Sequence, residues 1–276
     1  MFEVTRTDTG FAEVNGARLY YEVAGEGHPL VLIHGGVMDR RMWDDQFSVL
    51  AQHYRVIRYD VRSSGNSTNS GNEFSFLEDL HGLLSHLGHG SAYLLGSGGG
   101  SVIAIDFALS YPDKVDALIL ASPRVTGHTW SEELLRKHEP LNAALKEGDI
   151  ARAIELRLQI WIDGPMRTAE QVNPAFRERI RDMMMYNYKV DSLSHAWGKL
   201  RKLEPLAIYR LTELRAPALL VVGDQDEREA LGLADMMEAH ISGARNAVLH
   251  GSCSTAVNME QPENFNQIVL DFLHSL

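Results

Sequence analysis

The sequence predicts an α/β fold, in which helices cover both faces of a mostly parallel central sheet and a helical segment is inserted between two core strands. Short continuous apolar runs that end at glycine, histidine or aspartate predict buried parallel strands. Helical stretches between most of these runs predict the covering layers. Folds of this class place their sites in the loops beyond the carboxyl ends of the strands.

The strands and helices alternate along most of the chain. An alternating, β-rich segment at 17–24 predicts an edge strand. Apolar runs predict further strands at 29–33, 55–59, 91–95, 116–121, 218–222 and 246–249. Helices are predicted at about 43–52, 76–87, 100–111, 229–241 and 262–275. Together these elements make a core of residues 1–124 and 214–276.

Residues 125–213 interrupt this rhythm and predict a helical cap, or lid. The segment is rich in charge and has no strand-like run. Thr129 with Glu132, and Thr168 with Gln171, have the spacing of capping boxes at helix starts. Its large side chains either pack the lid onto itself and the core or line an apolar pocket beneath it. These side chains are Trp130, Trp161, Met183–Met185, Tyr186 and Trp197.

Composition excludes several classes of partner. The 276 residues carry a net charge of −11, which repels nucleic acid and anionic membranes. No apolar run is long enough to span a membrane, and no signal-peptide pattern is present at the start, so we expect a cytoplasmic protein. One cysteine and scattered histidines predict no disulfide, metal or cofactor. A small molecule is the expected partner, and the oligomeric state stays open, a homodimer included.

Five motifs in order carry a resemblance to a known family. They are Val31–Gly36 with Trp43 after it, Asp60–Arg62 with Gly65–Ser67, Leu94–Gly100, Pro217–Asp226 and Met259–Glu263. Over nearly the whole chain they resemble the α/β-hydrolase superfamily, in the branch of small bacterial esterases, lactonases and cofactor-free haloperoxidases. The resemblance implies an α/β-hydrolase fold with a serine, histidine and acid triad, and relatives that hydrolyse small carboxylic esters or lactones.

The nucleophile position of this chain is a glycine. The family motif G-x-S-x-G is a tight strand-to-helix turn that exposes the serine. Gly96, Gly98 and Gly100 occupy its glycine and serine positions, and Pro112 has the family's usual distance from Gly98. Glycine accepts the strained turn but has no atom that can attack. Ser97 would need a one-residue shift that turns its side chain from the pocket, and Ser101 is expected to be a structural hydroxyl.

The histidine position is also altered, whereas the acid and the oxyanion hole are kept. The family's spacing from Glu260 places threonine, Thr255, in the histidine position, and a hydroxyl cannot act as a base near neutral pH. By resemblance Asp226 matches the acid. The oxyanion hole needs two backbone N–H groups, which the resemblance assigns to Gly36 and Gly99. His250, upstream of the histidine position, is expected to be structural or solvent-facing.

Three functions remain open. Loss of the serine or the histidine costs a triad enzyme about 10⁶ in turnover, so ordinary acyl-enzyme catalysis is not expected. The chain could first be a small-molecule binder, similar to the N-myc downstream-regulated group, which has glycine at the elbow. It could second be a non-hydrolytic lyase, cyclase or cofactor-free oxygenase. It could third be an esterase or lactonase disabled by substitution. A non-hydrolytic enzyme would need Asp226, His128 or His195 as base. Cys253 has no histidine placed by the motif to activate it.

Pocket candidates complete the predicted site. They are His34, Trp43, Ser97, His128 and Trp161.

Overall fold

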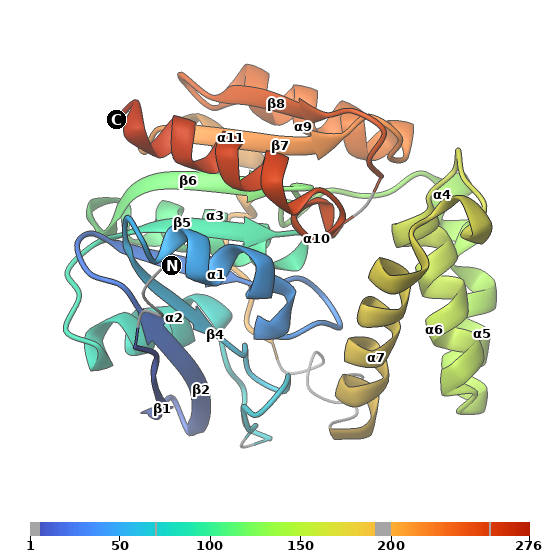
Figure 1. Cartoon of the computed structure of the whole chain (residues 1–276), viewed down its shortest axis with the longest axis horizontal. Coiled ribbons are helices and arrows are strands. Elements are labelled where there is room, and N and C mark those ends of the chain that lie inside the picture. The colour runs from blue at the N-terminus through green and yellow to red at the C-terminus, as the bar shows by residue number, and fades with distance from the viewer. Residues whose placement is uncertain (1–5, 70, 191–199, 254) are drawn as a thin grey trace.

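The computed structural model describes residues 6–69, 71–190, 200–253 and 255–276 (Figure 1). Its centre is a sheet in the order β1-β2-β4-β3-β5-β6-β7-β8. The strands are β1 (Asp8–Val14), β2 (Ala17–Ala24), β3 (Pro29–Ile33), β4 (Arg55–Tyr59), β5 (Ala92–Ser97), β6 (Val115–Ala121), β7 (Ala218–Gly223) and β8 (Arg245–Leu249). Pairing is parallel from β4 to β8 and antiparallel at β1 and β2, which confirms the predicted mostly parallel sheet.

The prediction that residues 17–24 form an edge strand is wrong. The strand itself exists, but β1 pairs with its free side and forms the edge instead. Asn15 and Gly16, with φ of 47° and 75°, make the two-residue turn that joins β1 to β2. This turn geometry favours Asn-Gly, because both central residues need positive φ. Most of β1 is exposed or half-buried, so it lacks the apolar run of the inner strands.

Helices bury both faces of the sheet. They are α1 (Asp44–Leu50), α2 (Phe76–His86), α3 (Gly99–Ser110), α9 (Arg228–His240), α10 (Val257–Glu260) and α11 (Pro262–His274). Along β3, Val31 and Ile33 belong to the core cluster shared with α2, α3 and α9, whereas Leu30 and Leu32 belong to the cluster shared with α1 and α11. Figure 1 shows α1 and α11 in front of the sheet. Burial on both faces explains why the inner strands are continuously apolar.

The segment between β6 and β7 is helical. It contains α4 (Glu132–Lys137), α5 (Glu139–Glu147), α6 (Ile150–Leu158) and α7 (Pro174–Val190). A wider helical turn at Gln159–Asp163 continues α6. Figure 1 shows these helices gathered at one side of the sheet, toward which the arrowhead of β6 points. The candidates His195 and Trp197 lie outside the described residues.

One of the two predicted capping boxes is confirmed. The backbone N–H of Thr168 donates to Oε1 of Gln171 at 2.8 Å, within a reciprocal box that begins a short 3₁₀ turn. The box at Thr129 and Glu132 is wrong, because α4 begins only at Glu132. Its N-cap is Ser131, whose Oγ accepts from the N–H of Leu134 at 3.2 Å. A serine closer to the helix therefore takes the capping role.

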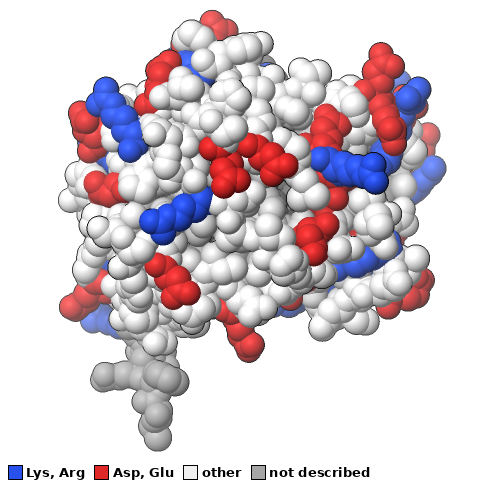
Figure 2. Space-filling view, turned by 90° about the horizontal axis from the view of Figure 1, so that it is seen from above, with Lys and Arg blue, Asp and Glu red and all other residues white. Residues whose placement is uncertain are grey.

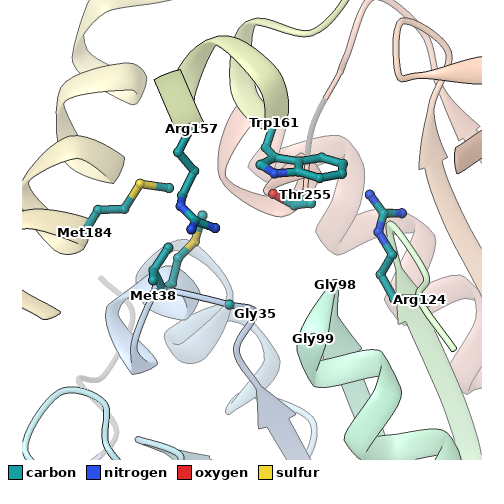
Figure 3. Close-up of a pocket in the computed structure, with 11 residues that line it drawn as sticks. Gly35, Met38, Gly98, Gly99, Arg124, Arg157, Trp161, Met184 and Thr255 are labelled. Carbon is teal, nitrogen blue, oxygen red and sulfur yellow. The ribbon is translucent and has the colours of Figure 1, made fainter. Parts of the chain in front are cut away.

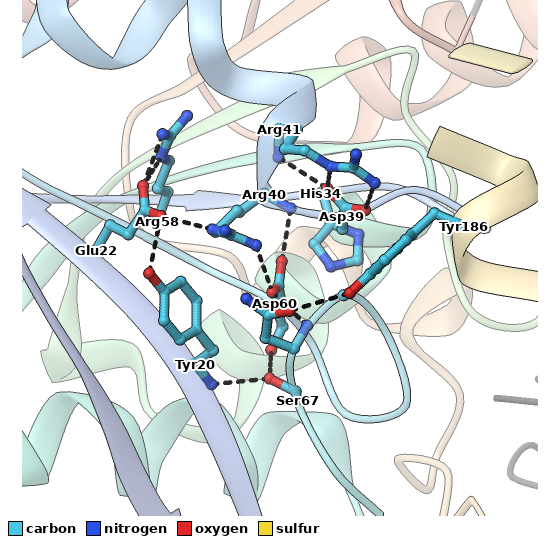
Figure 4. A network of polar contacts seen from close by, with 12 residues as sticks. Tyr20, Glu22, His34, Asp39, Arg40, Arg41, Arg58, Asp60, Ser67 and Tyr186 are labelled. Carbon is cyan, nitrogen blue, oxygen red and sulfur yellow. Dashed lines mark hydrogen bonds and ion pairs between the residues drawn. The ribbon is translucent and has the colours of Figure 1, made fainter. Parts of the chain in front are cut away.

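Polar contacts hold helix α7 to the loops that follow β3 and β4. Oδ1 of Asn187 accepts from the N–H of Gly65 at 2.7 Å, and Nδ2 donates to Oδ2 of Asp39 at 2.9 Å. Nearby, Tyr186 donates its hydroxyl to Oδ1 of Asn66 at 3.1 Å. Figure 4 shows Tyr186 reaching from α7 toward the loop around Asp60. Buried amides need such partners, so these contacts fix where the helical segment sits on the core.

Charge is mixed on the face seen from the side of β8 and α9. Figure 2 shows acidic and basic side chains interspersed there, without one large basic cluster. Within the part of the chain that the structure describes, we find no helix with the length and apolar character needed to cross a membrane.

Candidate functional site

The turn between β5 and α3 has the backbone of a nucleophile elbow. Gly98 has φ 52° and ψ −110°, and α3 begins at the next residue. A Cβ atom at Gly96 would lie 2.4 Å from the carbonyl oxygen of Gly100, and one at Gly100 would lie 2.1 Å from that of Ile33. A Cβ at Gly98 would meet only Thr255, at 3.8 Å. Packing therefore requires glycine at the two outer positions, whereas the middle one has room for a side chain directed at Thr255.

Two backbone N–H groups meet beside this elbow. A Cβ atom on Gly99 would lie 3.2 Å from the backbone nitrogen of Gly36, so the two residues are close neighbours. Gly99 is the first residue of α3, where the backbone N–H has no partner within the helix. Both glycines line the same cavity. This is the arrangement expected for an oxyanion hole, which uses backbone donors only.

His34 supports the loop that carries Gly36. The ring is buried, and its Nε2 accepts from the N–H of Val61 at 3.0 Å. Nδ1 therefore carries the proton and donates to the carbonyl of Gly35 at 3.2 Å. Burial lowers the pKa of His34, which keeps the ring neutral. His34 thus holds two site loops together beneath the cavity and does not line it.

Thr255 stands on a loop that the carboxylate of Glu260 organises. Glu260 Oε2 accepts from Oγ of Ser252 at 2.6 Å, and the guanidinium of Arg167 pairs with the same carboxylate. The N–H of Thr255 donates to the carbonyl of Trp161 at 3.3 Å, which joins this loop to the helical segment. The position predicted for the histidine therefore faces Gly98 from a loop held by ionic and backbone contacts.

Asp226, the predicted acid, is buried behind this loop. Its Oδ1 accepts from the N–H of Glu227 at 2.8 Å. Burial raises the pKa of Asp226, and the nearby positive charge of Arg124 acts in the opposite direction. No direct ion pair joins these two side chains among the contacts of the described residues. Asp226 is also not among the described residues that line the cavity.

A cavity of about 210 Å³ opens above the elbow (Figure 3). Its described lining consists of Gly35, Gly36, Val37, Met38, Gly98, Gly99, Arg124, Arg157, Trp161, Met184 and Thr255. The walls are mostly apolar, and the lining side chains that ionise are two arginines. Figure 3 shows Arg157 descending from α6 on one side and Arg124 on the other side of the space above Gly98.

Among the predicted pocket aromatics, Trp161 lines the cavity and Trp43 does not. Trp43 is fully buried, with its ring centroid 6.4 Å from that of Phe265 on α11, so it belongs to the core. Trp161 packs near Trp130 at 6.1 Å, and its ring lies 5.1 Å from the guanidinium carbon of Arg124. It therefore forms one wall of the cavity and also orients a charged neighbour.

The predicted hydroxyl and imidazole candidates lie elsewhere. Ser97 is buried, and its Oγ donates to the carbonyl of Thr255 at 2.6 Å, which turns it away from the cavity. His128 packs against Trp130 and has Nε2 3.6 Å from a carboxylate oxygen of Glu229. Ser101 donates to the carbonyl of Gly98 at 2.6 Å, the structural role predicted for it.

His250 and Cys253 are held away from reactive positions. His250 is exposed, with Nδ1 2.9 Å from Oδ2 of Asp224. Cys253 is fully buried against Gly164, and burial raises the pKa of its thiol far above the usual range. A thiol that stays protonated is a poor nucleophile. The described residues also contain no cluster of three His, Cys, Asp or Glu side chains placed to hold a metal ion.

The sequence interpretation missed the two arginines of the cavity. Arg124 follows β6, at the carboxyl edge of the sheet where sites are usually found. Its position in the sequence could therefore have identified it as a candidate. Arg157 lies on α6, where one charged residue among several looks like part of a solvated face.

Comparison with known proteins agrees with this geometry. A family model described as the alpha/beta hydrolase fold matches residues 28–252. The (E)-2-((N-methylformamido)methylene)succinate hydrolase of Acinetobacter baylyi is 25% identical over 265 residues, which are 95% of this chain and 96% of that protein. The 2-hydroxy-6-oxononadienedioate/2-hydroxy-6-oxononatrienedioate hydrolase of Burkholderia vietnamiensis is 27% identical over 270 residues, covering 93% and 91%.

Solved structures share the whole architecture. The enol-lactonase of Burkholderia xenovorans superposes with a TM-score of 0.80 at 24% identity, over 96% of this chain and all of that one, which concerns the fold alone. A thermophilic esterase of Thermogutta terrifontis gives a TM-score of 0.77 at 25% identity, over 97% and 98%. With the sheet, the inserted helices and a family match across most of its length, the chain belongs to the alpha/beta hydrolase fold family.

Proposed function

We propose that this chain binds a small molecule in the cavity above the elbow and does not catalyse acyl transfer through a serine. The observation that carries the proposal is the middle glycine of the elbow. Gly98 has the backbone of a nucleophile position and room for a side chain, yet it supplies no attacking atom. Thr255, which faces it, cannot serve as the base at neutral pH.

The side chains that line the cavity also do not favour other acid–base chemistry. Its described side chains include no histidine, carboxylate, lysine or thiol. Arginine does not give up its proton near neutral pH, so it cannot act as a general base. Binding without turnover is therefore better supported than a lyase, cyclase or oxygenase reaction.

We further infer that residues 125–213 act as a cap over the ligand. Arg157, Trp161 and Met184 come from this segment and line the cavity together with core glycines. The two curated relatives are named as hydrolases of small organic acids, which supports a small-molecule ligand over a macromolecular one.

A second candidate is a disabled variant of a working ester or lactone hydrolase. The space at Gly98 favours it, because a Cβ atom there would meet only Thr255, at 3.8 Å. The test compares this chain with the double variant Gly98→Ser/Thr255→His on short-chain p-nitrophenyl esters and lactones. We expect no enzymatic turnover from the chain itself. A gain of roughly 10³-fold or more in the double variant would favour the disabled hydrolase.

Adding Asp226→Asn to the double variant is the matched control, because it leaves serine and histidine in place and removes the acid. Most of the restored gain should then be lost, because loss of the acid costs an intact triad about 10⁴ in turnover. Rapid hydrolysis by the unmodified chain, abolished by a cavity substitution such as Trp161→Ala, would contradict the proposal of binding without acyl transfer.

A further inference from the structure

The cavity contains two guanidinium groups whose hydrogen-bonding capacity is incompletely used. Nη2 of Arg124 and Nε of Arg157 are shielded from solvent and have no hydrogen-bond partner among the described residues. Arg124 donates from Nη1 to the carbonyl of Pro123 at 3.0 Å, whereas Arg157 makes no ion pair with any of the described residues. Unpaired buried donors are costly, and a ligand that accepts from these two, which face a cavity, would remove that cost.

Several other arginines of the described residues hold carboxylates, whereas Arg124 and Arg157 contact none. Arg177, for example, donates from Nε and Nη2 to the two carboxylate oxygens of Asp163, each at 2.9 Å. Arg62 leaves its Nη1 without a partner but still donates twice to Asp79, so its charge is compensated by a carboxylate. Burial lowers the pKa of Arg124. The negative charge of Asp226 raises it, although the two side chains are not in contact. Positive charge is thus concentrated in one cavity of a chain whose net charge is −11.

The remaining walls indicate what kind of anion fits. Met38, Met184 and Trp161 offer apolar surface, and the N–H groups at Gly36 and Gly99 offer further donors at the floor. A free inorganic phosphate would leave the apolar walls without a partner. An organic acid would place its carboxylate on the arginines and its body against the methionines and the tryptophan.

We propose that the ligand of this cavity is a small organic carboxylate, bound through Arg124 and Arg157. This inference rests on the proposed function, because it names the class of molecule that the cavity binds. Arginine pairs with carboxylates through parallel N–H donors, which gives orientation as well as affinity. Gly98 assists by leaving open the space that a serine side chain would fill.

The experiment is isothermal titration calorimetry of the full chain with four acids: succinate, glutarate, benzoate and phenylacetate. Each acid is paired with its uncharged amide, and inorganic phosphate is titrated separately. We expect at least one acid to bind, its amide to bind at least about tenfold more weakly, and phosphate to bind more weakly than that acid. Arg157→Gln and Arg124→Gln should each raise the Kd of the acid by roughly tenfold or more.

Arg152→Gln is the matched control, because Arg152 lies on the same helix as Arg157 and its side chain is exposed. It removes the same charge outside the cavity and should leave the Kd within about twofold. Thermal unfolding of each variant checks that the fold persists.

Three outcomes would overturn the inference: no acid binds, the amides bind equally well, or phosphate binds best. The ester assay separates this failure from failure of the proposed function. If the chain hydrolyses no ester and binds none of the acids, the carboxylate inference fails and the absence of acyl transfer stands. If the chain hydrolyses esters, the proposed function fails whatever the titrations give.

Discussion

Alanine substitutions at the three elbow glycines should have very different effects on stability. In Gly98→Ala the new methyl group meets only Thr255 at 3.8 Å, an ordinary contact. Its cost is the positive φ of 52°, about 1–3 kcal/mol, reduced by about 0.4–1 kcal/mol because alanine also restricts the unfolded chain. We therefore expect Gly98→Ala to lower the free energy of unfolding by at most about 2.6 kcal/mol.

Gly96→Ala and Gly100→Ala place a methyl group 2.4 Å and 2.1 Å from backbone carbonyl oxygens. Neither oxygen can move without displacing helix α3 or strand β3, so each variant should lose more than about 3 kcal/mol. Urea unfolding followed by circular dichroism measures all three, and a constant m-value confirms that only stability has changed. Equal losses at Gly96, Gly98 and Gly100 would refute the assignment of Gly98 to the nucleophile position.

Three further predictions concern single side chains. Burial raises the pKa of Asp106 to about 6, so between about pH 4 and 6 the folded state holds more protons than the unfolded state and stability falls as pH rises. Asp106→Asn, which still accepts from Thr126, should raise the free energy of unfolding above pH 6 by at most about 3 kcal/mol and change little at pH 4, as pH-dependent urea titration would show. Asn187→Ala should lower the free energy of unfolding by about 1–3 kcal/mol and speed hydrogen exchange in α7, because the N–H of Gly65 loses its acceptor. Ser97→Ala, added to the double variant with restored serine and histidine, should keep the ester hydrolysis rate within about tenfold; a far larger loss would make Ser97 the nucleophile.

The inner strands could be predicted closely because burial on both faces leaves a strong local record. Residues 29–33 and 55–59 were expected with the bounds that β3 and β4 have. β1 was missed because its exposed face and polar residues resemble a loop. The Asn15–Gly16 turn carried the missing signal, since this pair joins the two strands of a hairpin. The cap of α4 was misplaced because Thr129 and Ser131 both have capping side chains, and only tertiary packing decides which one is used.

For the candidate site, too, the sequence predicted some residues and not others. Positions set by the backbone, such as Gly98 at its turn and Gly36 beside Gly99, could be located by motif and spacing. Of the side chains that enter the cavity from the inserted helices, Trp161 was expected but Arg157 was not, because the placement of α6 depends on contacts far apart in the sequence. Arg157 reaches the cavity only because α6 and α7 pack together on the core.

The outer glycines of the elbow and the two residues that face each other across the cavity differ in how tightly they are packed. Gly96 and Gly100 are fixed by close backbone contacts, so the elbow and its N–H donors persist whatever stands at the middle position. Gly98 and Thr255 line the cavity, and a Cβ at Gly98 would meet only Thr255, at 3.8 Å. Under the proposed function, this chain lacks a nucleophile and a base while the backbone N–H groups of Gly36 and Gly99 remain at the floor of the cavity. Arginines placed above that floor would then favour retention of an acid over its turnover, because they supply charge and no base.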